Sequence, residues 1–341
     1  MAYTTIDKSS DYFNTLLYTG NGSARSITGV GFQPDWVWVK SRTTTHQPVL
    51  SDSVRGTGKE LRSDTTDAES SLGDITSFDS DGFSIGTRGE INNNTTPFVS
   101  WNWKASGSTA SNTDGSITST VSANTTAGFS IVSFTGTGAN ATVGHGLGSA
   151  PRMMIFKNRD EGAEGWFVYH ESIGNTKRLL LDETSATSTS STFWQDTSPT
   201  SSVFSVGSNH GCNGPDAMIC YAFAEKKGYS KFGSYVANGN SDNAFVHTGF
   251  KVAFLMTKLS STSGGSWEIV DNKRDGFNGE NHRLYPSDES AEGTGNDYDL
   301  LSNGFKVRQS GGSQQSGRTN IYMAFAENPF VSSGGIPCTA R

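Results

Sequence analysis

The chain has 341 residues and a formal net charge of −7, with 33% hydrophobic, 11% aromatic and 17% charged residues. The negative charge disfavours a nucleic-acid-binding protein, and the absence of an apolar run of about 18 residues predicts no membrane insertion. The 40 glycines, with Ser, Thr and Asn between short apolar runs, predict an all-β protein, because tight turns favour these residues.

In chain order, the first predicted elements are a short N-terminal arm, residues 1–12, and a β-sandwich, residues 13–106. The amino terminus lacks the basic and apolar regions of a secretory signal peptide. We expect the arm to attach the protein to a neighbour, or to add a strand to one. In the sandwich, Trp36 and Trp38 alternate along one strand and therefore share a face.

The segment that contains Trp36 and Trp38 recurs twice later in the chain. GFQPDWVWVK at 31–40, GSAPRMMIFK at 148–157 and GFKVAFLMTK at 249–258 align without gaps. Four further landmarks recur in the same order around each copy. This self-similarity predicts three tandem antiparallel β-sandwiches of jelly-roll or concanavalin-like type. Their predicted boundaries are 13–106, 127–228 and 229–330, with a Ser/Thr/Asn-rich linker at 107–126 and a flexible tail at 331–341.

Two glycine clusters, TGTG and GHGLG, lie in residues 128–159 and invite comparison with a phosphate-binding loop. Such a loop needs a helix after its glycines, whereas the residues that follow, MMIF, are typical of a strand. His145 also aligns with Thr28 and Val246 in the other copies, so the copies do not share it. The glycines are therefore interpreted as turns between strands.

Other charged motifs each allow two readings. DSDG at 79–82 begins like a calcium loop but is better explained as a turn. The pairs Asp52/Arg55 and Asp271/Arg274 are interpreted as structural ion pairs rather than as ligand sites. The acidic residues of 67–69 and 289–292 are expected to be solvated, although a glycoside hydrolase would use such carboxylates. With no GxSxG motif either, the chain is predicted not to be an enzyme.

Cysteines and aromatic residues complete the candidates. Cys212, Cys220 and Cys338 lack metal-type spacing, and no metal or other cofactor is expected. The paired tryptophans could fill a core or stack on sugar rings. Trp194, in the polar stretch TFWQD, is the least core-like of them. It is therefore predicted as a possible ligand contact, and so are two residues of a later loop, Asn278 and His282.

The assembled landmarks resemble a repeat family encoded in the structural modules of marine tailed bacteriophages. The resemblance covers nearly the whole chain. It rests on the segments MAYTTIDKSSDYFNTLLYTGNGS, PDWVWVKSR, DSVRG, TSFDSDGFSIG, NTDGSITSTVSANTTAGFSIVSFTGTG, VGHGLG, GYSKFGSYVANG, DNKRD and IYMAFAENPF. Members of that family are described as tail fibre or virion structural proteins with lectin-like, concanavalin-type sandwich domains. The resemblance implies no catalytic residues.

The resemblance implies a non-enzymatic virion protein assembled in the host cytoplasm. The preferred hypothesis is a tail fibre or tail-associated adhesin that contacts host surface polysaccharide. Its expected partners are other virion proteins and further copies of itself in a homo-oligomer. The alternative is an architectural component, capsid-decorating or tail-associated, with no host ligand. A polysaccharide-degrading sandwich enzyme is the third and least favoured reading.

Overall fold

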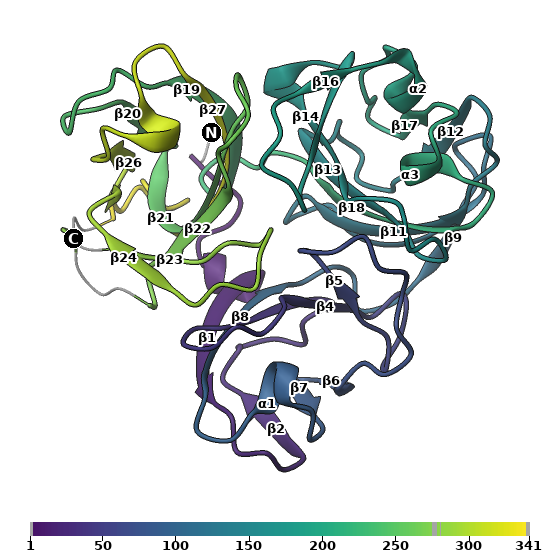
Figure 1. Ribbon diagram of the computed structural model, residues 1–341, viewed down its shortest axis with the longest axis horizontal. Coiled ribbons are helices and arrows are strands. Elements are labelled where there is room, and N and C mark those ends of the chain that lie inside the picture. The colour runs from purple at the N-terminus through teal and green to yellow at the C-terminus, as the bar shows by residue number, and fades with distance from the viewer. Residues whose placement is uncertain (1–2, 275–277, 280, 339–341) are drawn as a thin grey trace.

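The computed structural model describes the chain except for residues 1–2, 275–277, 280 and 339–341. It consists of antiparallel sheets joined by turns and a few single-turn helices, so the all-β prediction is confirmed. The sheets form three units arranged around a common centre (Figure 1). In the described part of the chain, no helix is long and apolar enough to cross a membrane.

The first unit, β1 to β8, has a five-stranded sheet in the order β1-β8-β3-β4-β5 and a three-stranded sheet in the order β2-β7-β6. Val37, Val39, Phe83 and other apolar side chains fill the space between the two sheets. The elements are η1 (Ser9–Asp11), β1 (Phe13–Thr19), β2 (Arg25–Thr28), β3 (Trp36–Ser41), β4 (Val49–Asp52), β5 (Leu61–Arg62), β6 (Ile75–Asp79), β7 (Gly82–Ile85), α1 (Gly89–Asn92) and β8 (Pro97–Trp103).

The second unit, β9 to β18, has an eight-stranded sheet in the order β16-β15-β14-β13-β18-β11-β10-β9 and a two-stranded sheet, β12-β17. Phe156, Trp194 and Phe204 lie in the core between them. The elements are β9 (Ala110–Asn112), β10 (Ser119–Asn124), β11 (Phe129–Thr135), β12 (Ala141–Gly144), β13 (Met153–Asn158), β14 (Phe167–His170), η2 (Glu171–Ile173), β15 (Lys177–Leu180), β16 (Ser188–Thr189), α2 (Ser191–Trp194), β17 (Val203–Val206), α3 (His210–Asn213) and β18 (Ala217–Phe223).

The third unit, β19 to β27, has sheets in the orders β19-β27-β21-β22, β20-β26-β25 and β23-β24. Leu255, Phe305 and Tyr322 belong to its internal core. The elements are β19 (Ser230–Val236), β20 (Phe245–His247), β21 (Phe250–Leu259), β22 (Trp267–Asp271), β23 (Asn281–Arg283), β24 (Gly293–Gly295), β25 (Tyr298–Leu301), β26 (Gly304–Val307), η3 (Gly312–Gln314) and β27 (Thr319–Pro329).

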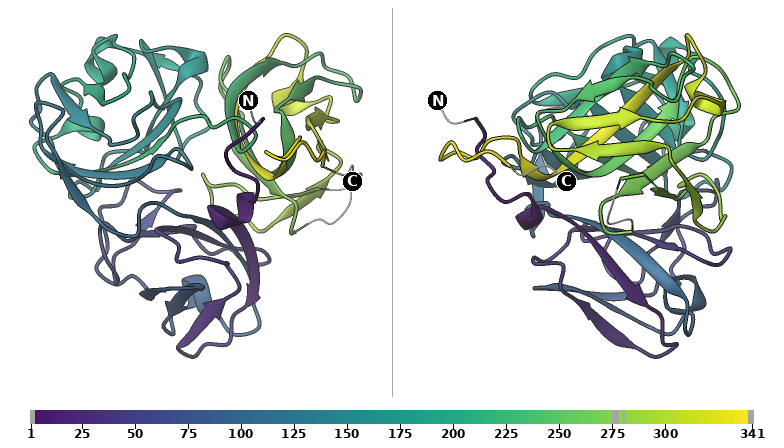
Figure 2. Two further views of the ribbon diagram at one scale, coloured as in Figure 1. Left: turned by 180° about the vertical axis from the view of Figure 1, so that it is seen from behind. Right: turned by 90° about the vertical axis from the view of Figure 1, so that its left-hand side faces the viewer.

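Three connecting segments are more ordered than the sequence predicts. Residues 107–126, expected to be a linker, contain β9 and β10, and β10 pairs with β11 as a strand of the second unit. The N-terminal arm runs beside the third unit (Figure 2), where the Tyr3 hydroxyl donates a hydrogen bond to the Gly249 carbonyl at 2.7 Å. In the C-terminal tail, the Ser333 amide donates to Asp7 at 2.6 Å. The described parts of the arm and tail therefore pack on their own chain.

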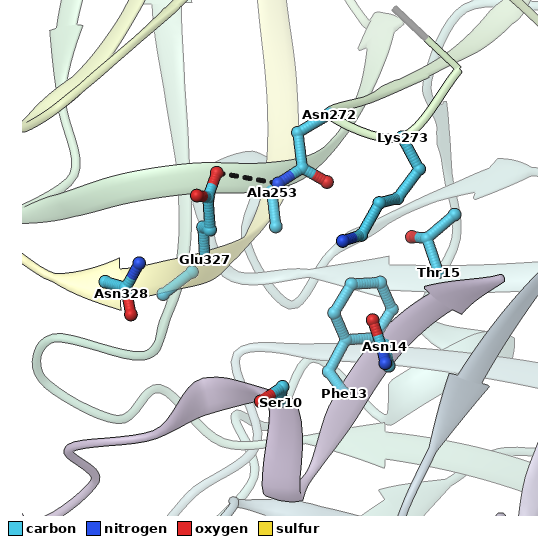
Figure 3. Close-up of a pocket in the computed structure, with 10 residues that line it drawn as sticks. Ser10, Phe13, Asn14, Thr15, Ala253, Asn272, Lys273, Glu327 and Asn328 are labelled. Carbon is cyan, nitrogen blue, oxygen red and sulfur yellow. Dashed lines mark hydrogen bonds between the residues drawn. The ribbon is translucent and has the colours of Figure 1, made fainter. Parts of the chain in front are cut away.

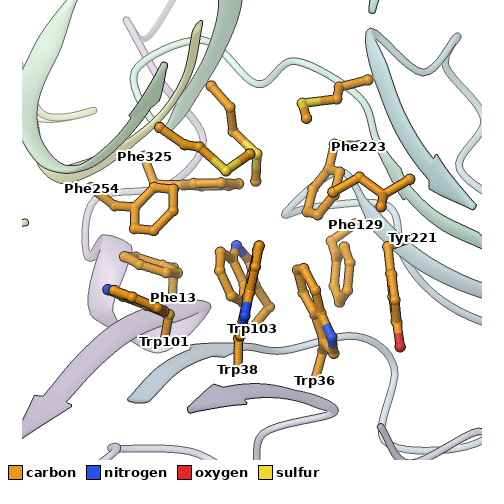
Figure 4. Close-up of a cluster of buried hydrophobic side chains, with 14 of the residues drawn as sticks. Phe13, Trp36, Trp38, Trp101, Trp103, Phe129, Tyr221, Phe223, Phe254 and Phe325 are labelled. Atoms are coloured by element: carbon orange, nitrogen blue, oxygen red, sulfur yellow. The ribbon is translucent and has the colours of Figure 1, made fainter. Parts of the chain in front are cut away.

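The outer faces of the three large sheets meet in a shared aromatic core at the centre of the molecule (Figure 4). Its rings include Trp36, Trp38, Trp101 and Trp103 of the first unit, Phe129, Tyr221 and Phe223 of the second, and Phe254 and Phe325 of the third. The Trp36 and Tyr221 rings stack with centroids 4.3 Å apart. The four tryptophans are at most 1% exposed, so they are core residues and not a sugar-binding face.

This arrangement explains why β3 reads as a continuous apolar run. Successive side chains of a strand point to opposite faces, so Val37 and Val39 face the inside of the first unit while Trp36 and Trp38 face the shared core. A strand buried on both faces needs apolar residues at every position, as in a sheet covered on both sides.

The interface between the first and second units contains a buried chain of four charged side chains. Asp52 pairs with Arg55 at 2.5 Å, Arg55 with Glu69 at 3.1 Å, and Glu69 with Arg159 of the second unit at 2.9 Å. The Tyr221 hydroxyl of the second unit donates to Asp52 at 2.7 Å. Burial alone would lower the pKa of Arg55, but the adjacent Asp52 carboxylate outweighs it and the pKa is raised.

The third and first units meet through an equivalent chain. Asp271 pairs with Arg274 at 2.7 Å, and Glu292 pairs with both Arg274 at 3.4 Å and Arg42 of the first unit at 2.8 Å. The Trp101 indole N–H donates to Asp271 at 3.0 Å. Both sequence-predicted Asp–Arg pairs are thus confirmed. The expectation of solvated acidic loops is wrong for Glu69 and Glu292, because each carboxylate is held between two arginines.

Neutral groups replace these charges between the second and third units. His170 corresponds to Asp52 in the strand pairing. His170 lies opposite Met153, the first residue of β13, and Asp52 lies opposite Trp36, the first residue of β3. The His170 Nε2 lies 3.1 Å from the Tyr322 carbonyl, and its Nδ1 accepts from the Ser172 amide at 3.2 Å. These partners require a neutral imidazole with the proton on Nε2, and burial lowers the pKa of His170 to about 4.

A loop of the first unit also packs into the second, and a loop of the second unit packs into the third. The Nζ of Lys157 donates to the Thr66 carbonyl of the first unit at 3.0 Å, and that of Lys258 to the Ser185 carbonyl of the second at 3.0 Å. The indole N–H groups of Trp166 and Trp267 likewise donate to carbonyls of the preceding unit. Lys157 and Lys258 therefore anchor inter-unit loops, whereas the aligned Lys40 donates to the His46 carbonyl of its own unit. Burial lowers the pKa of the Lys157 and Lys258 amines to about 8.

Replacing Arg55 with Met should lower the free energy of unfolding by about 3–5 kcal/mol, because Asp52 and Glu69 remain buried and lose a positive partner. Urea denaturation monitored by tryptophan fluorescence measures this loss. Arg152→Ala is the control, since Arg152 is 41% exposed in its pair with Glu171 and should contribute about 1 kcal/mol or less. Equal losses for the two variants would contradict a structural role for the buried chain.

The contribution of His170 to the stability of the protein should fall as the pH is lowered from about 6.5 to about 5. The pKa of His170 is about 4 in the folded state and about 6.5 in the unfolded state, so the unfolded state binds more protons in this window. This single group contributes at most about 1.4 kcal/mol per pH unit. Urea denaturation at both pH values gives the change in the free energy of unfolding. On acidification this change should be more destabilising in wild type than in His170→Gln, and an equal change in the two proteins would contradict the assignment.

Candidate ligand pocket

Of the predicted ligand contacts, Trp194 is placed differently from the prediction. It lies in α2, a single helical turn begun by Ser190, whose hydroxyl accepts from the Thr192 amide. Trp194 is 1% exposed, packs against Phe156 with the ring centroids 5.1 Å apart, and donates its indole N–H to the Lys177 carbonyl at 2.9 Å. The polar sequence around it forms the outer side of the turn, so Trp194 is a core residue and not an exposed side chain.

His282 also serves the internal structure. Its Nδ1 lies 2.5 Å from the Glu292 carboxylate, which belongs to the charged chain between the third and first units. The imidazole is 28% exposed. His282 therefore extends the charged chain toward the surface rather than lining a ligand pocket with Asn278.

Asn278 is the predicted site residue that the structure places in a pocket. It is exposed, and its side chain bridges the backbone of Leu300. The Asn278 amide donates to the Leu300 carbonyl at 3.1 Å and its oxygen accepts from the Leu300 N–H at 2.9 Å. This two-bond bridge fixes the loop against β25.

The pocket beside Asn278 has a volume of about 490 Å³. Its lining residues are Ser241, Asn278, Gly279, Asn296, Asp299 and Arg308. They come from the loop after β19, the loops before β25, β25 itself and the residue that follows β26. This places the pocket at the second sheet of the third unit, on the side opposite the shared aromatic core.

The chemistry of this pocket is polar. Arg308 donates from Nε to Asp299 at 2.6 Å while 37% of its side chain stays exposed, so the guanidinium retains donors for a ligand. Asp299 is the one carboxylate among the described lining residues, and it is paired. A hydroxyl-rich ligand could exchange hydrogen bonds with these groups, whereas the two-carboxylate arrangement of glycoside hydrolysis is not formed by them.

A second open pocket, of about 480 Å³, lies where the second unit leads into the third. Arg152, Tyr169, Glu171, Glu225 and Lys227 are among its lining residues. Arg152 and Glu171 form an exposed ion pair in it. Because the Arg152–Glu171 pair is solvated, this pocket provides a comparison for the pocket beside Asn278.

The other sequence motifs are turns, as predicted. Asp81 of the DSDG motif accepts from the amides of Gly29 and Gly31, at 3.1 and 2.7 Å. In GHGLG, Gly146 and Gly148 adopt positive φ angles of 71° and 67° between β12 and β13, and His145 is buried. Among the described residues, no group of three or more His, Cys, Asp or Glu side chains could hold a metal ion.

Comparison with known proteins identifies a family without an assigned activity. No curated protein and no solved structure matches the chain. Residues 8–329 match a family described as a domain of unknown function (DUF7483). The match spans all three units, from η1 to the end of β27. The chain therefore belongs to the DUF7483 family.

Proposed function

We propose that the protein is a non-enzymatic structural component of a phage virion, a tail fibre or tail-associated adhesin that contacts host surface glycans. The polar pocket beside Asn278 carries this proposal. Its serine hydroxyl, asparagine amides and partly exposed guanidinium match the donors and acceptors of a saccharide. The resemblance of the sequence to virion repeat proteins supports the proposed location in a virion. Its further partners would be other virion proteins and copies of itself.

The rigidity of the molecule supports a binding role. The three units share one aromatic core, and ion pairs join the first unit to the second and to the third, so the pocket is held on a single block. A pre-organised site loses less conformational entropy on binding. A weak saccharide contact gains most from such a scaffold when several copies act together on one surface.

We also propose that the three units are three copies of one jelly-roll or concanavalin-like sandwich. The large sheets support this reading, because β1-β8-β3-β4, β11-β18-β13-β14 and β19-β27-β21-β22 have the same order. Their registers also agree, with Trp36 opposite Trp103, Met153 opposite Phe223 and Phe254 opposite Phe325. The divergent loops, rather than the common strands, would then carry the specific contacts.

The alternative proposal is an architectural virion component with no host ligand. One observation favours it: the outer edge of β1 has no strand partner other than β8 among the described strands. Such an edge suits attachment to another protein. The binding experiment below separates the two proposals.

Purified protein should bind isolated host surface polysaccharide saturably. Asn296→Ala and Arg308→Ala should each weaken that binding about tenfold, because each removes hydrogen bonds worth about 1–1.5 kcal/mol. Biolayer interferometry with immobilised polysaccharide measures the affinity. Arg152→Ala, in the second pocket, is the matched control and should bind like wild type. Absence of binding by wild type, or equal binding by all variants, would contradict the adhesin proposal.

A further inference from the structure

One edge strand corresponds among the three large sheets, and its outer side is covered differently in each unit. The edge strands at corresponding positions are β1, β11 and β19, since each lies beside the strand that carries Trp103, Phe223 or Phe325. In the second unit, the chain before β11 folds back as β10 and pairs with it. The structure thus contains its own example of a strand added to this edge.

The pairing of β10 shows which groups this edge offers. β10 runs antiparallel to β11, with Thr120 opposite Ser133, Ser122 opposite Ile131 and Asn124 opposite Phe129. Its side chains are small, and Ser122 is fully buried. An edge strand of this type therefore accepts an extended segment rich in Ser, Thr and Ala.

The corresponding edge of β19 is blocked by its own chain. The Ser230 amide donates to the Lys226 carbonyl at 2.9 Å, and the Phe232 amide donates to the Glu225 carboxylate at 3.3 Å. The single turn η2 of the second unit also packs against this strand. Two of its outward backbone donors are thereby satisfied, which protects the edge against strand addition.

Among the described residues, neither a strand nor such a turn pairs with the outer edge of β1. The Lys104 N–H donates to the Tyr12 carbonyl at one end of the strand, and the Gly20 N–H donates to the Thr96 carbonyl at the other. The backbone groups of the even-numbered residues of β1 therefore point toward β8. Because alternate residues of an antiparallel edge strand point their backbone groups outward, the N–H groups of Thr15 and Leu17 face away from β8. Leu17 is 37% exposed. The preceding residues turn through η1 to the third unit instead of folding back.

A pocket of about 200 Å³ lies at the start of this open edge (Figure 3). Phe13, Asn14 and Thr15 form one side, and Asn272 and Lys273 are among the residues of the other. Figure 3 shows the Lys273 side chain extending into the pocket. By the correspondence of β1 with β11, the last residues of β10 and its turn occupy this place in the second unit.

Thr15 marks the pocket as a site for a polar ligand. It faces Trp101 in the register, where the second and third units have Ile131 opposite Tyr221 and Phe232 opposite Met323. Thr15 is 4% exposed, and its Oγ1 has no hydrogen-bond partner among the described residues. A buried hydroxyl without a partner is costly, and an incoming backbone or side-chain group could satisfy it.

We propose that the open edge of β1 binds an extended segment of another protein by strand addition. The segment pairs antiparallel to β1, as β10 pairs with β11, and places small Ser, Thr or Ala side chains toward the pocket. Its backbone groups satisfy those of Thr15 and Leu17. The site is separate from the pocket beside Asn278, so this inference does not depend on glycan binding.

The test uses the chain's own added strand as a probe. A fluorescent peptide with the sequence of residues 115–126, GSITSTVSANTT, should bind the full-length protein saturably, because β11 already holds its own copy and β1 is open. Fluorescence anisotropy gives the affinity. Leu17→Pro should weaken binding at least tenfold, because proline removes an outward N–H that β8 does not use. Leu17→Ala keeps that N–H and should bind within about threefold of wild type.

Hydrogen exchange on the wild-type protein provides a second readout that needs no variant. Peptide binding should slow exchange at the amides of Thr15 and Leu17 and leave β19 unchanged. No binding at millimolar peptide, equal binding by the proline and alanine variants, or protection away from β1 would overturn the proposal. Self-association of the protein that the peptide reverses would also overturn it, since the occupant would then be a second copy.

Discussion

The shared aromatic core at the centre of the molecule is the feature on which the rest of the structure depends. Each large sheet is covered on one face by its own second sheet and on the other by two neighbouring units. Four tryptophans of the first unit supply much of this core. Large aromatic side chains bury more apolar area than any others, so a few positions can hold three units together. The molecule is consequently one block rather than a row of separate sandwiches.

The charged chains give that block a defined arrangement. A buried ion pair stabilises a fold only weakly on balance, because both ions lose hydration, but a mismatched partner is strongly unfavourable. Two interfaces each pair two acids with two arginines, whereas the third uses His170 and backbone groups. Exchanging one unit for another would therefore leave buried charges without partners. The order of the units around the centre is fixed by this difference.

The three large sheets share a strand order but differ in the segments that precede their edge strands. The segment before β11 adds two strands to the second unit, the segment before β1 crosses to the third unit, and the segment before β19 caps its edge. The open edge of β1 and the polar pocket beside Asn278 thus occur on a scaffold whose three large sheets share one strand order. Sites of this kind would permit specific contacts without altering the central core.

The sequence by itself determined the features that depend on neighbouring residues. Alternating apolar residues and glycine-rich turns predicted the strands and the GHGLG and DSDG turns. Two related motifs, each with an Asp and an Arg three residues apart, predicted the two ion pairs. Tertiary packing decided the rest. Glu69 and Glu292 look like solvated loop acids, and their parallel positions after the two Asp–Arg pairs were the available sign of a shared role. Trp194 looks exposed because its neighbours in sequence are polar, although its neighbours in space are aromatic. The burial of a side chain is set by residues far away in the chain, which is why local pattern could not assign it.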